Sequence, residues 1–136
     1  MRRFISLLVA AAAAAGCATP GDEIRAHTYP AGFEYITRKD VKTVMAELAR
    51  VAGELDATLS TSAPVDPARV LLILDQLDRA ADSIDAGGVS TNHPMLGANM
   101  ARFRFNLQSA RAGAAAAPPN YYLAGSVIGS CRYCHQ

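Results

Sequence analysis

Residues 38–60 read RKDVKTVMAELARVAGELDATLS, and this run carries the clearest structural signal in the chain. Apolar residues recur in it at intervals of three and four, while charged residues fill the positions between them. That spacing predicts an amphipathic helix with one buried stripe. The residues of the stripe are Val41, Val44, Met45, Leu48, Val51, Ala52, Leu55 and Leu59.

Three further segments show the same periodicity. The second predicted helix begins with Asp66 as N-cap and Pro67 as first helical residue, and it ends near Asp85, before a Gly-Gly pair. The third follows His93-Pro94 and runs to about residue 112, and the fourth runs from residue 120 or 121 to the C-terminus. The prolines at 118 and 119 separate the last two, because neither can donate a backbone hydrogen bond.

These segments predict an all-α fold, an antiparallel up-down-up-down four-helix bundle over residues 37–136. A low aromatic content of 7%, without tryptophan, favours helix packing over a β-sandwich. In such a bundle the end of the fourth helix lies beside the start of the first, the end of the second and the start of the third. Residues 131–135 are therefore expected near residues 38–45 and near residues 93–100. The second predicted helix also carries Leu71 and Leu72 outside its stripe, which suggests a second packing surface and a homodimer.

The N-terminus has the pattern of an export signal. Two arginines precede an apolar run from Phe4 to Ala15, which is too short for a spanning helix. Small residues then lead to Cys17, as in a bacterial lipobox. We expect a signal peptide at 1–16, then Cys17 as the lipidated residue and a linker over 17–36. An ordinary signal peptide cut near Ala18 is the alternative. The predicted location is the periplasmic face of a membrane, with a lipid anchor.

The charge balance excludes one class of partner. The chain has 13 Lys and Arg against 12 Asp and Glu, for a formal charge of +1. Nucleic-acid binding needs a basic surface, so we expect no nucleic-acid partner.

The last residues contain the motif Cys131-Arg132-Tyr133-Cys134-His135, which is C-x-x-C-H, the attachment pattern of a c-type haem. Two thiols on one turn reach the two vinyl groups of the porphyrin, and the following imidazole reaches the iron. We therefore expect one covalent haem c, bound through Cys131 and Cys134, with His135 as proximal ligand. A disulfide, a thiol–disulfide redox pair or half of a zinc site are the alternatives for this cysteine pair.

With this motif on the last of four predicted helices of an exported chain, the sequence resembles the cytochrome c′ family from about Arg38 to Gln136. The resemblance implies that Cys131 and Cys134 form the thioethers, that His135 is the proximal ligand and that Arg38 contacts a haem propionate. The chain departs from the family in ending one residue after the histidine. It departs again in having Lys42 where the family has leucine or methionine over the distal face.

The sixth ligand of the iron is left open between five alternatives: Met45, Lys42, His93, Met100 and a vacant site. Met45 fits the buried stripe and is the candidate distal ligand. Lys42 is expected to reach a propionate with its ammonium group, with its stem along the haem edge. His93 suits an N-cap or surface role, and Met100 a core position.

The predicted function is that of a membrane-tethered periplasmic monohaem cytochrome, which transfers electrons, binds a diatomic gas at the iron, or does both. Its redox partner protein is not indicated by the sequence. No Ser/His/Asp set, paired carboxylates or phosphate loop points to an enzyme. The alternative is a structural envelope lipoprotein with a Cys131–Cys134 disulfide and no haem.

Overall fold

The computed structural model describes residues 21, 24, 28–85, 87–133 and 135. This part of the chain is mostly helical, as predicted, with four α-helices and one short 3-10 helix. Two short strands, which the sequence did not predict, form a small parallel sheet. The elements in chain order are β1 (Phe33–Glu34), α3 (Arg38–Leu59), α4 (Pro67–Asp82), β2 (Ser90–Thr91), α5 (Pro94–Ala114), α6 (Tyr122–Gly129) and the 3-10 helix η2 (Ser130–Tyr133).

The starts of the first two helices are defined by side-chain caps. At α3, the Thr37 hydroxyl accepts from the backbone N–H of Asp40, and the Asp40 carboxylate accepts from the backbone N–H of Thr37. At α4, Asp66 accepts from the backbone N–H of Ala68, with Pro67 in the first turn as predicted. These contacts satisfy amides that have no partner inside the helix, so each helix begins at a definite residue.

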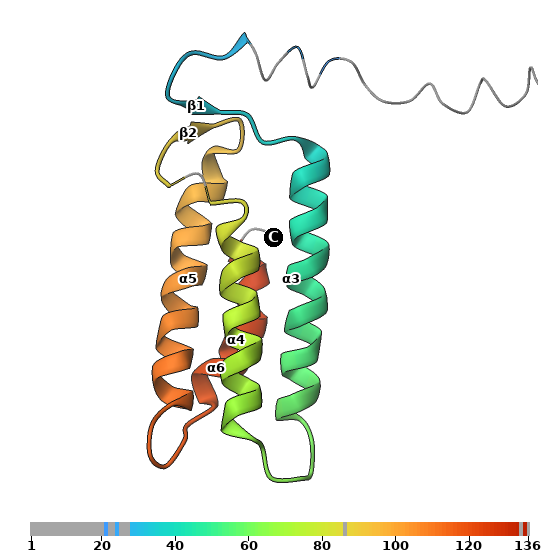
Figure 1. Ribbon diagram of the computed structural model, residues 1–136, viewed down its shortest axis with the longest axis vertical. Coiled ribbons are helices and arrows are strands. Elements are labelled where there is room, and N and C mark those ends of the chain that lie inside the picture. Colours follow the sequence, from blue (N-terminus) through green and yellow to red (C-terminus); the bar gives the residue numbers. More distant parts are fainter. Residues whose placement is uncertain (1–20, 22–23, 25–27, 86, 134, 136) are drawn as a thin grey trace, which may run out of the picture. The chain divides into compact units, whose positions relative to one another are not determined.

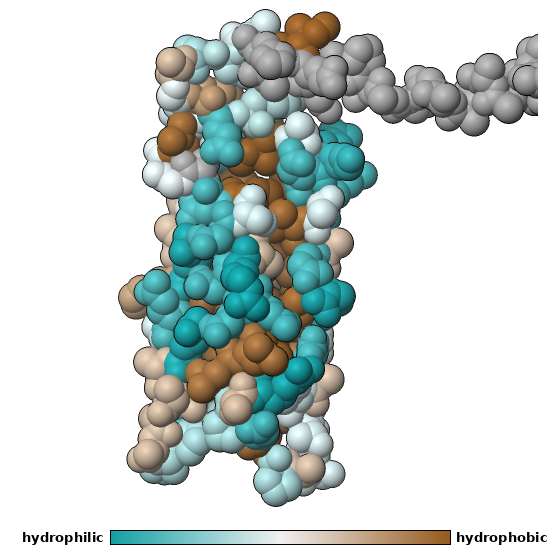
Figure 2. All heavy atoms as spheres, in the orientation of Figure 1, coloured by the Kyte–Doolittle hydropathy of each residue, from teal (hydrophilic) through white to brown (hydrophobic). Residues whose placement is uncertain are grey.

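The four helices pack in a ring in which α3 and α5 each contact both α4 and α6. Figure 1 shows the helices side by side, with successive helices running in opposite directions. Apolar residues fill the space between them, as burial of the stripes requires. The largest fully buried side chains are Val51, Leu55, Val70, Ile73, Leu74, Leu77, Leu107 and Val127. Figure 2 shows hydrophobic residues that reach the surface between the hydrophilic residues of α3 and α4.

The connection between α5 and α6 depends on a glycine. The α5 helix continues to Ala114, slightly past its predicted end. A Cβ atom added at Gly113 would lie 2.8 Å from the backbone oxygen of Asn120. The Asn120 N–H in turn donates to the Gly113 carbonyl over 2.9 Å. The absence of a side chain at Gly113 therefore allows the chain to close this loop against the end of α5.

Part of the segment predicted as a linker belongs to the folded unit, which begins at Gly32. Phe33 pairs with Ser90 and Glu34 with Thr91. Ile36 is buried, and its backbone is held by the side chain of Asn92, which accepts from the Ile36 N–H over 2.8 Å and donates to the Ile36 carbonyl over 2.9 Å. The side chain of Asn92 thus makes the two hydrogen bonds that a neighbouring strand would otherwise make with the backbone of Ile36, just before α3 begins.

The last helix is shorter than predicted. It ends at Gly129, and the first residues of the C-x-x-C-H motif lie on the 3-10 helix η2. Eight α-helical residues rise about 12 Å, whereas the 21 residues of α5 rise about 31 Å. Cys131 and His135 line one cavity with Met45 and Met100, so the motif lies next to the last residues of the two stretches, 38–45 and 93–100, beside which the sequence placed it.

Several predicted features lie outside the described residues, namely the signal peptide at 1–16, the lipidated Cys17, and Cys134. Within the described part, no helix is both long and apolar enough to cross a membrane.

Candidate functional site

A cavity of about 430 Å³ lies between α3, α5 and the C-terminal segment. The wall from α3 consists of Met45, Ala46, Leu48, Ala49 and Ala52. The wall from α5 consists of Asn99, Met100 and Phe103, and the C-terminal wall consists of Val127, Ser130, Cys131 and His135. The cavity thus joins two residues of the C-x-x-C-H motif to an apolar surface supplied by two helices.

Small side chains on α3 leave room for the cavity. Ala46, Ala49 and Ala52 follow one another at intervals of three residues, so they lie near one face of the helix. Toward the other end of α3, the larger Leu55 is fully buried in the core. A side chain of ordinary size at the three alanine positions would fill the space that the cavity occupies.

Cys131 and His135 lie at the mouth of the cavity, since both line it and both are exposed to solvent. The backbone N–H of His135 donates to the carbonyl of Cys131 over 3.2 Å, which closes one turn of chain between them. Cys131 is a free cysteine. The turn brings a thiol and an imidazole to the same opening, as the spacing of the motif predicts.

Two thioether side chains face the same space. Met45 on α3 is half-buried and Met100 on α5 is buried, and both line the cavity. Both were among the alternatives for the sixth ligand, Met45 as the candidate distal ligand and Met100 with a core position as its simplest role. The structure places Met100 in both settings, because it belongs to the hydrophobic core and borders the cavity.

Arg38 and Lys42, two further predicted site residues, are not among the residues that line the cavity. Arg38 is the first residue of α3 and Lys42 lies one turn later, and both are exposed. Met45 follows Lys42 by three residues on the same helix. The two cations therefore lie on the stretch of α3 that precedes the cavity.

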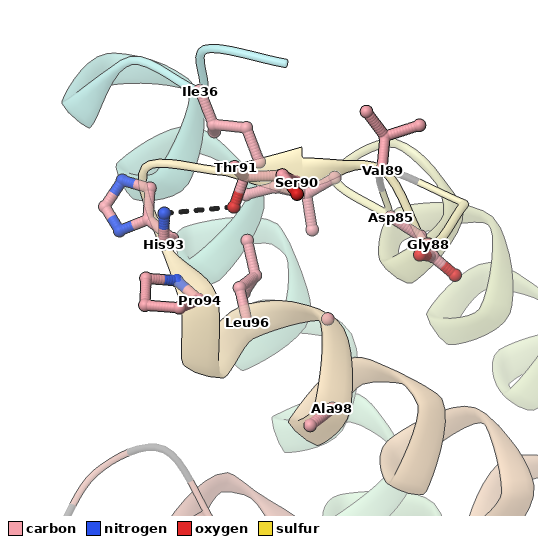
Figure 3. A pocket seen from close by; sticks show the side chains of 12 residues that line it. Ile36, Asp85, Gly88, Val89, Ser90, Thr91, His93, Pro94, Leu96 and Ala98 are labelled. Atoms are coloured by element: carbon pink, nitrogen blue, oxygen red, sulfur yellow. Dashed lines mark hydrogen bonds between the residues drawn. The ribbon is translucent and has the colours of Figure 1, made fainter. Parts of the chain in front are cut away.

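His93 borders a different cavity of about 390 Å³, next to the small sheet. It precedes α5 without capping it through its side chain, and its backbone N–H donates to the Thr91 hydroxyl over 3.0 Å. Figure 3 shows its imidazole beside Pro94, where β2 leads into α5, with Ile36 and Leu96 nearby. Among the described residues, His93 is thus separate from the wall that contains Cys131 and His135.

Two asparagines of the site were missed in the sequence. Asn99 is half-buried and brings a carboxamide to the apolar wall. Asn106 donates to the hydroxyls of Tyr133 and Ser130 over 3.1 and 3.3 Å. The signal was present in the spacing, because each asparagine directly precedes a residue of the buried stripe, Met100 or Leu107, and polar residues at that edge of a stripe often meet a neighbouring element.

Tyr133 has an altered acidity. Hydrogen bonds from Asn106 and with Ser130, together with the charge of Arg102, lower the pKa of the Tyr133 phenol below its usual value near 10. Its ring and its hydroxyl are therefore both in polar contact with neighbouring side chains.

Among the described residues, which omit Cys134, no three His, Cys, Asp or Glu side chains gather as a metal-binding group. No protein-family model, no curated protein and no solved structure matches the chain.

Proposed function

We propose that this chain is an exported, membrane-tethered monohaem c-type cytochrome of the cytochrome c′ type. The observation that carries the proposal is one apolar cavity whose mouth holds Cys131 and His135 and whose walls hold Met45 and Met100. Thiol, imidazole and thioether groups are the protein groups that attach and ligate haem iron in c-type cytochromes. Finding them at one cavity supports the C-x-x-C-H motif independently of its spacing.

The dimensions and polarity of the cavity suit a porphyrin. Its volume of about 430 Å³ lies within the range of about 300 to 1,000 Å³ that small-molecule sites occupy. Its walls are mainly Ala, Leu, Met, Phe and Val side chains, which match an apolar macrocycle. Cys131 and His135, which are both exposed, lie at its mouth, where a group attached to thiols can enter from solvent.

Each residue has a distinct task in this proposal. Cys131 and Cys134 form the thioether bonds, and His135 is the proximal ligand through a neutral imidazole nitrogen. Arg38 and Lys42, on the solvent-exposed start of α3, pair with the propionate carboxylates at the edge of the group. When bound, the haem supplies a one-electron redox centre and an iron that can take a further ligand.

Electron transfer and binding of a diatomic gas are the two activities that we propose for the haem. A thioether from Met45 or Met100 at the sixth position favours electron transfer, because it completes the coordination of the iron. The carboxamide of Asn99 favours gas binding, since it places a hydrogen-bond donor in an otherwise apolar wall. The sixth ligand therefore decides between the two activities.

The rest of the proposal concerns assembly and location. The four helices form an antiparallel up-down-up-down bundle that holds the haem between α3, α5 and the C-terminal segment. Cys17 carries the lipid that tethers the domain to the periplasmic face of a membrane. A homodimer contact is proposed at α4, where Leu72 is 44% exposed. The chain is not an enzyme and has a redox protein, not a nucleic acid, as its partner.

The decisive experiment is an absorption spectrum of the full-length protein, expressed with its own N-terminus in a bacterial host that matures c-type cytochromes. We expect a Soret band, one covalent haem per chain, and loss of both in a Cys131→Ala/Cys134→Ala variant. A wild-type protein without haem, but with one disulfide, would establish the structural lipoprotein instead.

A second spectrum distinguishes the two activities. Carbon monoxide is added to the ferrous protein and to Met45→Leu and Met100→Leu variants, whose side chains keep nearly the same volume. If a methionine ligates the iron, only its own replacement permits rapid CO binding. Rapid binding to the wild-type protein indicates a vacant sixth site and the gas-binding function.

The lipid anchor is tested separately by Cys17→Ser. We expect the wild-type protein in the membrane fraction and the variant in the soluble fraction of the periplasm. A variant that stays with the membrane argues against lipidation at Cys17.

A further inference from the structure

The C-x-x-C-H segment is attached to α5 through the side chain of Tyr133. The Nδ2 atom of Asn106 lies 3.1 Å from the Tyr133 hydroxyl and 3.3 Å from the Ser130 hydroxyl. One carboxamide on α5 therefore contacts the residue before Cys131 and the residue two places after it. The contact spans the first half of the motif.

A second α5 side chain contacts the same tyrosine. The guanidinium carbon of Arg102 lies 3.9 Å from the centroid of the Tyr133 ring, which is cation–π geometry. Arg102 and Asn106 are four residues apart and lie on the same side of the helix. The ring is thus held by its face and by its hydroxyl from a single helix.

The burial of Ser130 opposes separation of the C-terminal segment from α5. It is 4% exposed, and among the described residues it is the buried polar side chain next to the motif. A buried hydroxyl is stable only while it is hydrogen-bonded, and Asn106 is its side-chain partner. Movement of the segment away from α5 would leave Ser130 without that partner.

Cys131 and His135 face the cavity, whereas Tyr133, between them in the sequence, faces α5. Cys131 and His135 line the cavity, whereas Tyr133 meets Arg102 and Asn106 and is not part of the cavity wall. The same helix supplies cavity wall one turn earlier, through Asn99, Met100 and Phe103. Fixing Tyr133 on α5 therefore also fixes the distance between the motif and this wall.

We infer that Arg102 and Asn106 are positioning residues, which hold Tyr133 on α5 and thereby set the direction in which His135 presents its imidazole to the haem iron. This inference rests on the proposed function and adds two residues outside the motif to the site. Neither residue touches the cavity, so each acts through Tyr133.

The first test uses the haem-loaded, full-length protein with Tyr133→Phe, Asn106→Leu and the double variant. The readout is the iron–histidine stretching frequency of the ferrous protein, measured by resonance Raman spectroscopy. We expect each single variant to shift this frequency, and the double variant to shift it no further than the larger single one. Either change alone already breaks the same hydrogen bond, so the two effects are coupled.

The matched control is Tyr122→Phe, which removes a hydroxyl from a tyrosine that is 80% exposed. For the charge, Arg102→Gln is compared with Arg132→Gln, since Arg132 is an exposed cation beside Tyr133 in sequence. We expect Arg102→Gln to shift the frequency and Arg132→Gln to leave it unchanged. Equal shifts in the two would show a general charge effect and overturn the role of Arg102.

The second test does not depend on haem. Amide hydrogen exchange across residues 130–135 is measured in the protein as purified, whether or not it carries the group. We expect Tyr133→Phe and Asn106→Leu to raise the exchange rate about fivefold, the factor that corresponds to one lost hydrogen bond. Exchange no faster than in Tyr122→Phe would overturn the attachment of Tyr133 to α5. A wild-type protein without haem would overturn the proposed function and the orientation of His135 toward iron, and would leave the attachment of Tyr133 supported or contradicted by the exchange rates alone.

Discussion

Two cavities among the described residues have similar volumes but different walls. The cavity that contains Cys131 and His135 measures about 430 Å³ and is bounded mainly by α3 and α5, whereas the one beside His93 measures about 390 Å³ and is bounded largely by β2 and the chain around it. Volume alone does not identify a binding site here. The chemical groups in the wall and the helices that hold them distinguish the two, because of these two cavities only the first combines a thiol, an imidazole and two thioethers with an apolar surface.

The largest expected effect separates the two cavities by their histidines. We expect His135→Ala to abolish the normal ferric and ferrous absorption spectra, since the iron loses its proximal ligand. In contrast, His93→Ala leaves both spectra unchanged, because His93 borders the other cavity. Absorption spectra of the two purified variants check this prediction. A changed spectrum in His93→Ala would show that the second cavity communicates with the haem.

A smaller effect is expected from filling either cavity with a phenyl ring. Ala49→Phe introduces the ring into the wall of the first cavity, and overpacking of this kind costs about 1–3 kcal/mol. We expect the amount of haem per chain to fall at least about fivefold. The control is Ala98→Phe, at the second cavity, for which haem content stays at the wild-type level. Haem content is measured by pyridine haemochrome absorbance, and equal losses in both variants would contradict the assignment.

The hydrogen bonds between Asn92 and Ile36, which lies in the wall of the second cavity, are expected to contribute to the stability of the fold. Asn92→Ala removes both hydrogen bonds to the Ile36 backbone, and we expect a loss of about 1–3 kcal/mol in the free energy of unfolding. The absorption spectrum of the haem stays unchanged. Urea denaturation measures the loss, and Asn92→Asp, which keeps the acceptor but not the donor, is expected to lie between. A spectral change in Asn92→Ala would show that the two cavities are coupled.

The smallest effect is expected on the surface of α3, outside both cavities. Arg50 donates two hydrogen bonds to Glu47, which lower the pKa of this carboxyl below its usual value of 4.5. The ionised form is thus favoured in the folded state, and its stabilising contribution is present above pH 4.5 and is lost as the pH falls through the lowered pKa. Glu47→Gln should therefore be slightly less stable than wild type at pH 7 and equally stable near pH 2 to 3. Urea denaturation at the two pH values tests this, and a difference that persists in acid would contradict the cause.

The helices could be predicted because their signals are local. The stripe from Val41 to Leu59, and the pair Asp66-Pro67 at the start of α4, involve residues within a few turns of one another. The sheet could not be predicted, because β1 and β2 are two residues long and Phe33 pairs with Ser90, far away in the sequence. The early end of α6 was missed for a related reason, since an apolar segment does not show where an α-helix tightens into a 3-10 helix.

The candidate site was predictable to a similar degree. The motif spacing identified Cys131 and His135, and the stripe of α3 identified Met45, and the structure brings these three to one cavity. Met100 was one of several alternatives for the sixth ligand, and Asn99 was not assigned to the site, because the proximity of both to the motif depends on how far the C-terminal segment extends along α5. Asn106 was missed because its contact with Tyr133 joins residues 27 positions apart.

The close approach at Gly113 has a consequence for how this protein evolves. The backbone oxygen of Asn120 occupies the place that a Cβ would take, so a substitution there displaces the start of α6 and, with it, everything the C-terminal segment carries. In any lineage that keeps this connection, we expect glycine to be retained at this position even where the surrounding alanines and prolines drift. A residue in the last turn of α5, outside the cavity wall, would then be retained as strictly as the cysteines of the motif, and substitution of Gly113 by any other residue would mark a lineage in which the connection had been rebuilt.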